Sequence, residues 1–185
     1  MLETQIAPAA LASERATGIP AEISCAQCVL ESGWLQSVPA GSRNPFGIKA
    51  TSSVDPRVLA PTREWFDALE LWTFLLRGDK RSAQLDPAAA TAAVNGRRKF
   101  IVQDWFAAYP TLADAFTAHA NLLLRGAPYE AAVKQYAADG NLVALIRGIA
   151  QHYATDPHYA EQLEEIALSK EVTAIMERLR KVVIA

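Results

Sequence analysis

The stretch IPAEISCAQCVLESGW, residues 19–34, decides how the rest of the chain is read. Pro20 falls in the first turn of a predicted helix, where the N–H that proline lacks would have no partner anyway. Apolar residues recur at helical spacing and form one stripe: Ile23, Ala26, Leu30 and Trp34. Cys25, Cys28 and Val29 continue the apolar surface around the helix, and a helix that is apolar on most sides is normally buried. We therefore expect this helix at the centre of the fold.

Glu31 interrupts the apolar pattern near the end of this helix, directly before Ser32 and Gly33. A carboxylate at the mouth of a buried helix is partly desolvated, and desolvation raises its pKa. A carboxyl group that stays protonated in this way can act as the general acid that cleaves a glycosidic bond. The alternative interpretation is an ordinary exposed glutamate near a helix end.

Five blocks of sequence share a recognisable pattern: LESGW at 30–34, NPFGIK at 44–49, WFAAYP at 105–110, AHANLL at 118–123 and YATDPHYA at 153–160. These blocks resemble the glucosaminidase family of peptidoglycan hydrolases (glycoside hydrolase family 73-like), which includes the flagellar rod-cap muralytic domain and many autolysins. They follow the family's order and extend from about Ser13 to Ser169. Any one block alone is a weak signal, but together they are specific.

The resemblance implies a mainly α (α+β) fold, in which a lysozyme-like helical domain carries a small β-hairpin lobe across a cleft. The length of 185 residues fits one catalytic domain over residues 1–185, with a sizeable core. Hydrophobic residues make up 51% of the chain and charged residues 21%, which is typical of a globular protein.

Caps and apolar periodicity predict the helices outside the central one. We expect a tail over residues 1–7, a helix from Pro8 to Thr17 that Gly18 ends, and a mainly helical second half. Its helices are expected at 111–125, 129–138, 142–153, 158–167 and, as an amphipathic C-terminal helix, at about 169–183. Thr111 and Asn141 are predicted N-caps, and Thr155-Asp156-Pro157 is predicted to cap the helix that follows.

The segment from about residue 66 to residue 94 departs from the family's pattern. In the family, a tight turn and a return strand are expected to follow the first strand directly. Here Asn95-Gly96 and the residues after it supply that turn and strand. The sequence of the intervening segment predicts a helix around Trp72, which ends at Gly78, and the start of a second helix near Leu85. We interpret the segment as a helical insertion, either lining the cleft or lying remote from it.

Glu31 is the predicted general acid, and the resemblance implies Glu64 as the second carboxylate. Glu64 lies in Thr62-Arg63-Glu64, which looks like the family's Thr-x-Glu strand in the hairpin lobe. The alternative is a strand-edge carboxylate that pairs with Arg63 or Lys49. Asp67 and Glu70 are the fallback candidates, because the insertion begins beside them.

Five further residues are considered for the site. Tyr153 matches the family tyrosine that reaches the cleft, with a core tyrosine as the alternative. Asn44 and Phe46 follow the acid and are candidates for binding sugar, although Phe46 fits packing under the cleft floor equally well. Tyr109 offers a face on which a pyranose ring can stack. Trp34 offers another, although its place on the apolar stripe favours the core.

No metal site or cofactor is predicted. Cys25 and Cys28 form a lone Cys-x-x-Cys inside a helix with no second pair of ligands, so we expect two small buried packing residues. His119, His152 and His158 have no metal-binding spacing and are expected to be structural or exposed. The sequence contains neither a phosphate-binding loop nor a nucleophile elbow.

The charge and hydropathy patterns exclude several partners. The net charge is −2 and the pI about 5.9, so no basic excess points to nucleic acid. No apolar run is long enough to span a membrane. The first residues lack a secretory-signal pattern. For an enzyme that acts on the cell wall in the periplasm or outside the cell, we therefore expect a phage lysin, a virion component or non-classical export.

The resemblance implies an endo-β-N-acetylglucosaminidase that cleaves the bond from N-acetylglucosamine to N-acetylmuramic acid in peptidoglycan glycan strands. One alternative is a muramidase or lytic transglycosylase on the same fold, which would use Glu31 alone. The other is a non-catalytic wall-binding or virion structural protein. The oligomeric state is not predicted.

Overall fold

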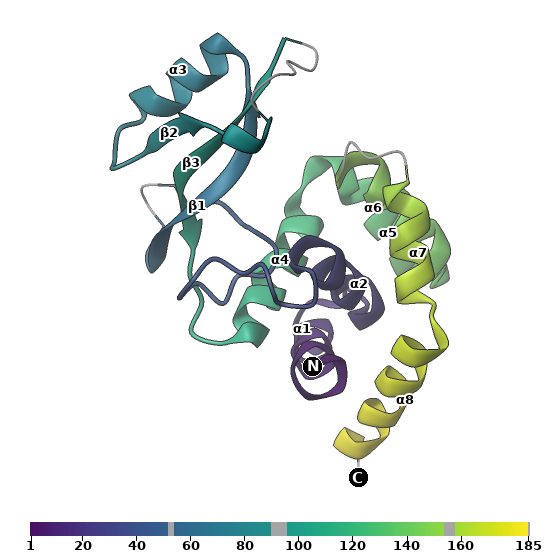
Figure 1. Cartoon of the computed structure of the whole chain (residues 1–185). Coiled ribbons are helices and arrows are strands. Elements are labelled where there is room, and N and C mark those ends of the chain that lie inside the picture. The colour runs from purple at the N-terminus through teal and green to yellow at the C-terminus, as the bar shows by residue number, and fades with distance from the viewer. Residues whose placement is uncertain (52–53, 90–95, 154–157, 185) are drawn as a thin grey trace. The chain divides into compact units, whose positions relative to one another are not determined.

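A computed structural model of the chain describes residues 1–51, 54–89, 96–153 and 158–184. The chain divides into two compact units, and each is described by itself (Figure 1). The helical unit comprises Met1–Val38, Arg43–Phe46 and Tyr109–Ala185. The sheet unit comprises Pro39–Ser42 and Gly47–Ala108.

The helical unit contains the helices that the caps predicted. They are α1 (Ala7–Thr17), α2 (Ala21–Ser32), α4 (Leu112–Arg125), α5 (Glu130–Asp139), α6 (Leu142–Tyr153), α7 (Tyr159–Ala167) and α8 (Lys170–Ile184). Gly18 ends α1 with a positive φ of 79°. The Thr111 side chain accepts a hydrogen bond from the backbone N–H of Asp114 in a capping box, and Asn141 caps α6 through Ala144. The predicted cap at residues 155–157 lies outside the described residues.

The prediction of a tail at the N-terminus was wrong. Leu2–Ile6 forms a π-helical turn that leads into α1, and both Leu2 and Ile6 are buried. The apolar spacing in this segment is too short to be recognised as a helix from sequence alone, because packing rather than local propensity holds it.

Helix α2 lies at the centre of the helical unit, as expected, and contacts α1, α4, α7 and α8 (Figure 1). Every residue from Ala21 to Val29 is buried. The main core joins α2 to the C-terminal helices, and its largest fully buried members are Ile19, Ile23, Leu123, Leu145, Ile146, Ile149 and Leu163. Because close packing surrounds α2, the helix is held in place, and so is Glu31 near its end.

The C-terminal helix α8 packs back onto the start of the chain. Arg180 forms ion pairs with Glu14 of α1 and with Glu22 of α2, at nitrogen–oxygen distances of 2.8 and 2.7 Å. Glu22 is 8% exposed and therefore depends on this partner.

The sheet unit contains three antiparallel strands in the order β1-β3-β2. Strand β1 (Arg57–Phe66) pairs along its whole length with β3 (Arg98–Ala107), and Glu64 lies opposite Phe100. Strand β2 (Ser82–Leu85) pairs with the other side of β3. The lobe therefore has a third strand beside the expected hairpin.

The insertion between β1 and β3 contains the predicted helix and an unpredicted strand. Helix α3 (Ala68–Leu76) begins at Asp67, whose side chain forms a capping box with Glu70. Strand β2 follows, and then a short 3-10 turn, η2 (Pro87–Ala89), near the predicted second helix start. The Asn95-Gly96 turn cannot be compared, because residues 90–95 lie outside the described part. In the described residues, no helix is long and apolar enough to cross a membrane.

Candidate functional site

The end of α2 fixes the position of Glu31. Gly33 adopts the left-handed conformation that stops the helix, at φ 54°. Ser32 is fully buried, and its hydroxyl donates to the carbonyl of Cys28 at 2.6 Å and accepts from the backbone N–H of Leu35 at 2.9 Å. The turn after Glu31 is therefore tied to the helix by a side chain.

Burial raises the pKa of the Glu31 carboxyl above its ordinary value, although the residue as a whole is exposed to solvent. The packed atoms behind the carboxyl remove water from one side of it, and this disfavours the charged form. The C-terminal end of a helix carries partial negative charge, which acts in the same direction. The environment predicted for a general acid is therefore present at this residue.

The Tyr159 hydroxyl opposes this shift. A hydrogen-bonding interaction with this hydroxyl lowers the pKa of the Glu31 carboxyl in part. Tyr159 is buried at the start of α7, and its hydroxyl accepts a hydrogen bond at 3.4 Å from Nε2 of the buried Gln27 on α2. Glu31 thus has a positioned hydrogen-bond partner that the sequence interpretation did not identify.

Tyr153, the tyrosine singled out from the sequence, lies behind Tyr159. The two rings are stacked with centroids 5.7 Å apart and an interplanar angle of 11°. The Tyr153 hydroxyl lies 3.1 Å from Nε2 of His119, and burial followed by the charge of Glu31 raises its pKa. The charge on Glu31 therefore affects the pKa of the Tyr153 phenol, while the Tyr153 hydroxyl is hydrogen-bonded to His119 within the core.

His119 links this tyrosine to the loop after α2. It is fully buried, and burial lowers the pKa of its imidazole to about 3, so the ring is neutral. Phe46 stacks on it with ring centroids 3.9 Å apart. Phe46 is itself buried and also contacts Phe116 edge-on. Its observed surroundings are those of the packing alternative.

The other candidates for sugar binding differ in exposure. Asn44 is fully buried, so its polar group faces the protein interior. Tyr109 is half-buried, and burial raises the pKa of its phenol. Its backbone carbonyl accepts a hydrogen bond from Arg43 at 3.4 Å. Trp34 was expected in the core but is 40% exposed, because α2 stops at Ser32 and the stripe does not continue to it.

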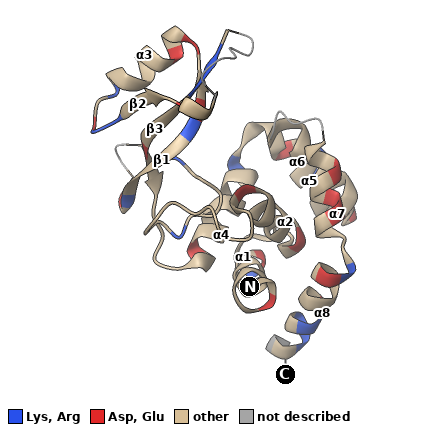
Figure 2. Ribbon diagram, viewed as in Figure 1, with Lys and Arg blue, Asp and Glu red and all other residues tan. Residues whose placement is uncertain are grey.

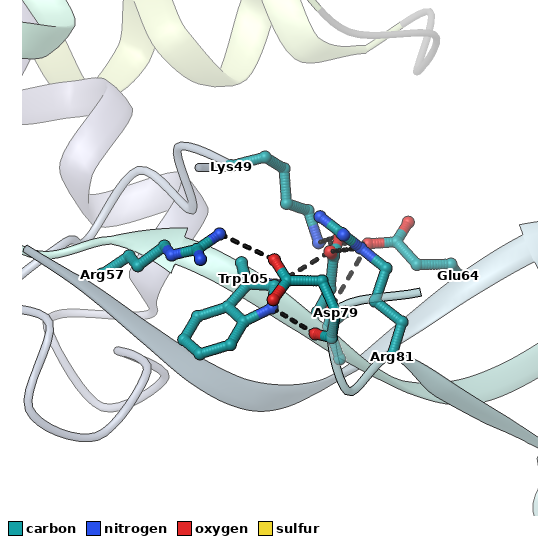
Figure 3. A network of polar contacts seen from close by, with 8 residues as sticks. Lys49, Arg57, Glu64, Asp79, Arg81 and Trp105 are labelled. Atoms are coloured by element: carbon teal, nitrogen blue, oxygen red, sulfur yellow. Dashed lines mark hydrogen bonds and ion pairs between the residues drawn. The ribbon is translucent and has the colours of Figure 1, made fainter. Parts of the chain in front are cut away.

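Glu64 lies in the sheet unit within a network of charges (Figure 3). Its carboxylate pairs with Lys49 at 2.8 Å, and Lys49 also lies 3.2 Å from Asp104. Arg81, which is nearly buried, pairs with the other oxygen of Asp104 at 2.8 Å. The ion pair with Lys49 was the alternative foreseen for Glu64, and Arg63 instead pairs with Asp86.

The two fallback carboxylates have structural partners. Asp67 and Glu70 form the capping box of α3, and Glu70 also pairs with Arg97. Both therefore have a role in the helix that explains their presence without chemistry.

The cysteines are packing residues, as predicted. Cys25 and Cys28 are free and fully buried, and burial raises the pKa of each thiol to about 12. Thiols with so high a pKa are unreactive at neutral pH. Within the described ranges, no three His, Cys, Asp or Glu side chains gather as metal ligands.

Comparisons with known proteins find a matching family model and a related peptidoglycan hydrolase. The family model described as mannosyl-glycoprotein endo-beta-N-acetylglucosaminidase (Glucosaminidase) matches residues 7–171. The peptidoglycan hydrolase FlgJ of Salmonella typhimurium is 30% identical over 179 residues, which cover 94% of this chain and 46% of that protein. The chain thus spans less than half the length of this relative.

Solved structures share the fold. The catalytic domain of the autolysin Auto from Listeria monocytogenes superposes with a TM-score of 0.62 at 19% identity, over 94% of this chain and 85% of that one. The glycoside hydrolase domain of Salmonella typhimurium FlgJ gives 0.58 at 24% identity, over 98% and 92%. The fold class is therefore the lysozyme-like helical domain with a small sheet. Within that class, the chain belongs to the glucosaminidase family.

Proposed function

We propose that this chain is the catalytic domain of a peptidoglycan hydrolase, an endo-β-N-acetylglucosaminidase that cleaves the bond from N-acetylglucosamine to N-acetylmuramic acid. Membership of the glucosaminidase family supports this proposal, as does the name of its FlgJ relative. The observation that carries it is Glu31, a carboxyl of raised pKa fixed at the end of a buried helix. The place of action is then the bacterial cell wall.

In this proposal Glu31 is the general acid. Its raised pKa keeps the carboxyl protonated to a higher pH than an ordinary glutamate, so it can protonate the leaving oxygen. The proton transfer leaves a carboxylate, which accepts the hydrogen bond of the Tyr159 hydroxyl. Tyr159 therefore stabilises the form of Glu31 that the step produces, and Tyr153 supports Tyr159 through the stacked ring.

Glu64 is the proposed second carboxylate, which stabilises positive charge as the glycosidic bond breaks. Lys49, which also pairs with Asp104, holds its carboxylate by an ion pair. If Glu64 acts in the transition state, Glu64→Gln lowers turnover strongly and leaves binding to purified wall unchanged. The matched control is Glu70→Gln on the same unit, which is expected to retain turnover. Normal turnover in Glu64→Gln would remove this residue from the mechanism.

Asn44, Phe46 and Tyr109 have different proposed roles at the sugar-binding surface. Tyr109 is the half-buried aromatic residue on which a pyranose ring can stack. Asn44 and Phe46 are buried, so we propose that they support the surface from beneath.

The test of the proposal is the lytic activity of Glu31→Gln, which preserves side-chain volume and removes the proton donor. General acid catalysis contributes about 10²–10⁴-fold, so we expect a loss of that order in the clearance of purified peptidoglycan. Glu165→Gln, at an exposed glutamate of α7, is the control and should clear the wall normally. Clearance by Glu31→Gln at the wild-type rate would refute the catalytic assignment, and wall binding without lysis by the wild type would favour a binding protein.

A further inference from the structure

Helix α3 exposes an unusual amount of apolar surface for so short a helix. Leu69, Trp72 and Leu76 are 70%, 61% and 63% exposed, and Leu75 is 40% exposed. The spacing i, i+3, i+7 places the first three on one face. Only Phe74 of this helix is buried, where it packs against Phe66 of β1. Clusters of exposed large apolar side chains mark interaction sites.

The apolar surface continues onto the neighbouring strand. Trp65 of β1 is 41% exposed, and a surface hollow of about 390 Å³ lies between it and Leu69 of α3. Arg77 also lines this hollow. The exposed face of α3 and Trp65 together form the surface that we call the α3 patch: Trp65, Leu69, Trp72, Leu75 and Leu76.

Basic residues border the α3 patch, and two of the acids beside it form ion pairs. Figure 2 marks Lys and Arg in blue along the segment that follows α3. Glu70 pairs with Arg97, and Asp79 pairs with Arg57. Arg77 and Lys80, both exposed, have no acidic partner among the described residues. The border therefore carries uncompensated positive charge.

Further basic side chains lie on β3 opposite the end of β1, with Lys99 across from Trp65 and Arg98 across from Phe66. Arg98 begins β3 and has no acidic partner in the described part of the chain, while the Lys99 ammonium lies 5.9 Å from the Trp65 ring. Residues 47–108 contain nine Lys and Arg against seven Asp and Glu, whereas the chain as a whole is acidic. The apolar patch thus lies on the more basic part of the molecule.

We propose that the α3 patch binds the surface of an anionic phospholipid bilayer. Leucine and tryptophan on one helix face, with Lys and Arg beside them, are the composition of helices that lie in the membrane interface. The basic border is complementary to anionic headgroups. Tryptophan is favoured at this depth because its ring is apolar and its N–H is polar.

The other occupants fit the patch less well. A stable interface between two copies needs about 20–30 residues on each side, and the patch offers five. A glycan needs polar groups that hydrogen-bond its hydroxyls, and Leu69, Leu75 and Leu76 present none. A bilayer needs neither a large area nor a complementary shape. Because α3 has only nine residues, the attachment is weak and reversible.

The experiment is co-sedimentation of the full chain with vesicles of pure phosphatidylcholine or of phosphatidylcholine and phosphatidylglycerol in equal parts. We expect binding to the mixed vesicles at least about tenfold above that to the pure ones, and weakening as salt is added. The triple variant Leu69→Ser, Trp72→Ser, Leu76→Ser should lose this binding. Its control replaces three exposed apolar residues of the helical unit: Leu122→Ser, Leu168→Ser and Val182→Ser.

A second variant separates charge from apolar contact. Arg77→Gln with Lys80→Gln should weaken binding by about fivefold for each charge removed and flatten its salt dependence. All variants are checked for folding by their thermal melting. Mixed vesicles that do not bind the wild type, or that bind the triple variant equally, contradict the proposal. The proposal is also contradicted if the wild type self-associates or binds purified wall and only the triple variant loses that interaction.

Discussion

At the scale of single residues, the proposed chemistry depends on what surrounds one carboxyl. Burial raises the pKa of Glu31, and one hydroxyl, that of Tyr159, moves it part of the way back. In the proposed mechanism, Tyr159 is therefore the residue through which the working pH of the site can be changed without replacing the acid itself.

Tyr159→Phe tests this relation through the pH profile. Removal of the hydroxyl removes a bond that stabilises the carboxylate, so the pKa of Glu31 should rise further. A general acid stays active until pH rises through its pKa, so the alkaline limb of the rate profile should shift to higher pH, with a lower maximal rate.

The control for Tyr159→Phe is Tyr136→Phe on α5. Burial raises the pKa of this half-buried tyrosine, Glu14 and Glu22 raise it further, Arg180 lowers it, and Glu31 does not contribute. Its profile should match that of the wild type. A Tyr159→Phe limb that stays in place or moves to lower pH would mean that the hydroxyl does not act on the acid.

The sequence could locate Glu31 but could not choose between the two tyrosines of its last block. Glu31 stands out because it ends an apolar helix, which is a local signal. Tyr153 and Tyr159 lie six positions apart in YATDPHYA, and both are apolar enough for a core. Which hydroxyl reaches the carboxyl depends on how α7 lies against α2, and that is a tertiary fact.

At the scale of elements, helix ends and the hairpin of β1 and β3 were predicted, and the third strand was not. Gly18, Thr111 and Asn141 act within a few residues of themselves, so their sequence signals are sufficient. Strand β2 is short, polar and at the sheet edge, and it forms only because β3 offers a partner. Its sequence, SAQL, contains no β-branched residue to announce it.

Arg180→Met tests how α8 is held to α1 and α2. The change leaves Glu22 nearly buried without its partner, and we expect unfolding to become easier by about 1–3 kcal/mol. The control is Arg178→Met, which breaks an exposed pair with Glu3 and should change stability by no more than about 0.5 kcal/mol. Denaturant titration measures both, and equal effects would contradict this account of the helix.

Gly148→Ala tests the close approach of α5 and α6. A Cβ at this position would lie 2.5 Å from the Cβ of Ala132, so the two helices would have to move apart. Alanine is the better helix former by about 1 kcal/mol, but overpacking costs about 1–3 kcal/mol. We expect a lower melting temperature in Gly148→Ala, and a higher one would show that the helices adjust freely.

At the scale of the whole molecule, the buried helix α2 carries the residue on which the proposed cleavage depends. The fold and the family were both readable from five short blocks of sequence, because each block carries a cap, a turn or a packed apolar face. For the insertion, the sequence predicted helix only. Strand β2 and the exposed face of α3 were not predicted, because they arise from how the insertion packs on the sheet unit. In the proposed function, the specificity lies in which sugar provides the anomeric carbon of the glycosidic bond whose oxygen Glu31 protonates.

The most direct test of the central claim is the identity of the new reducing ends in digested peptidoglycan. Purified wall is treated with the wild-type chain, reduced with borohydride, and the products are separated and identified by mass. The account predicts that N-acetylglucosamine is the reduced end, and that Glu31→Gln produces about 10²–10⁴-fold less of it. Reduced N-acetylmuramic acid, an anhydro-muramic end, or no new ends at all would contradict it.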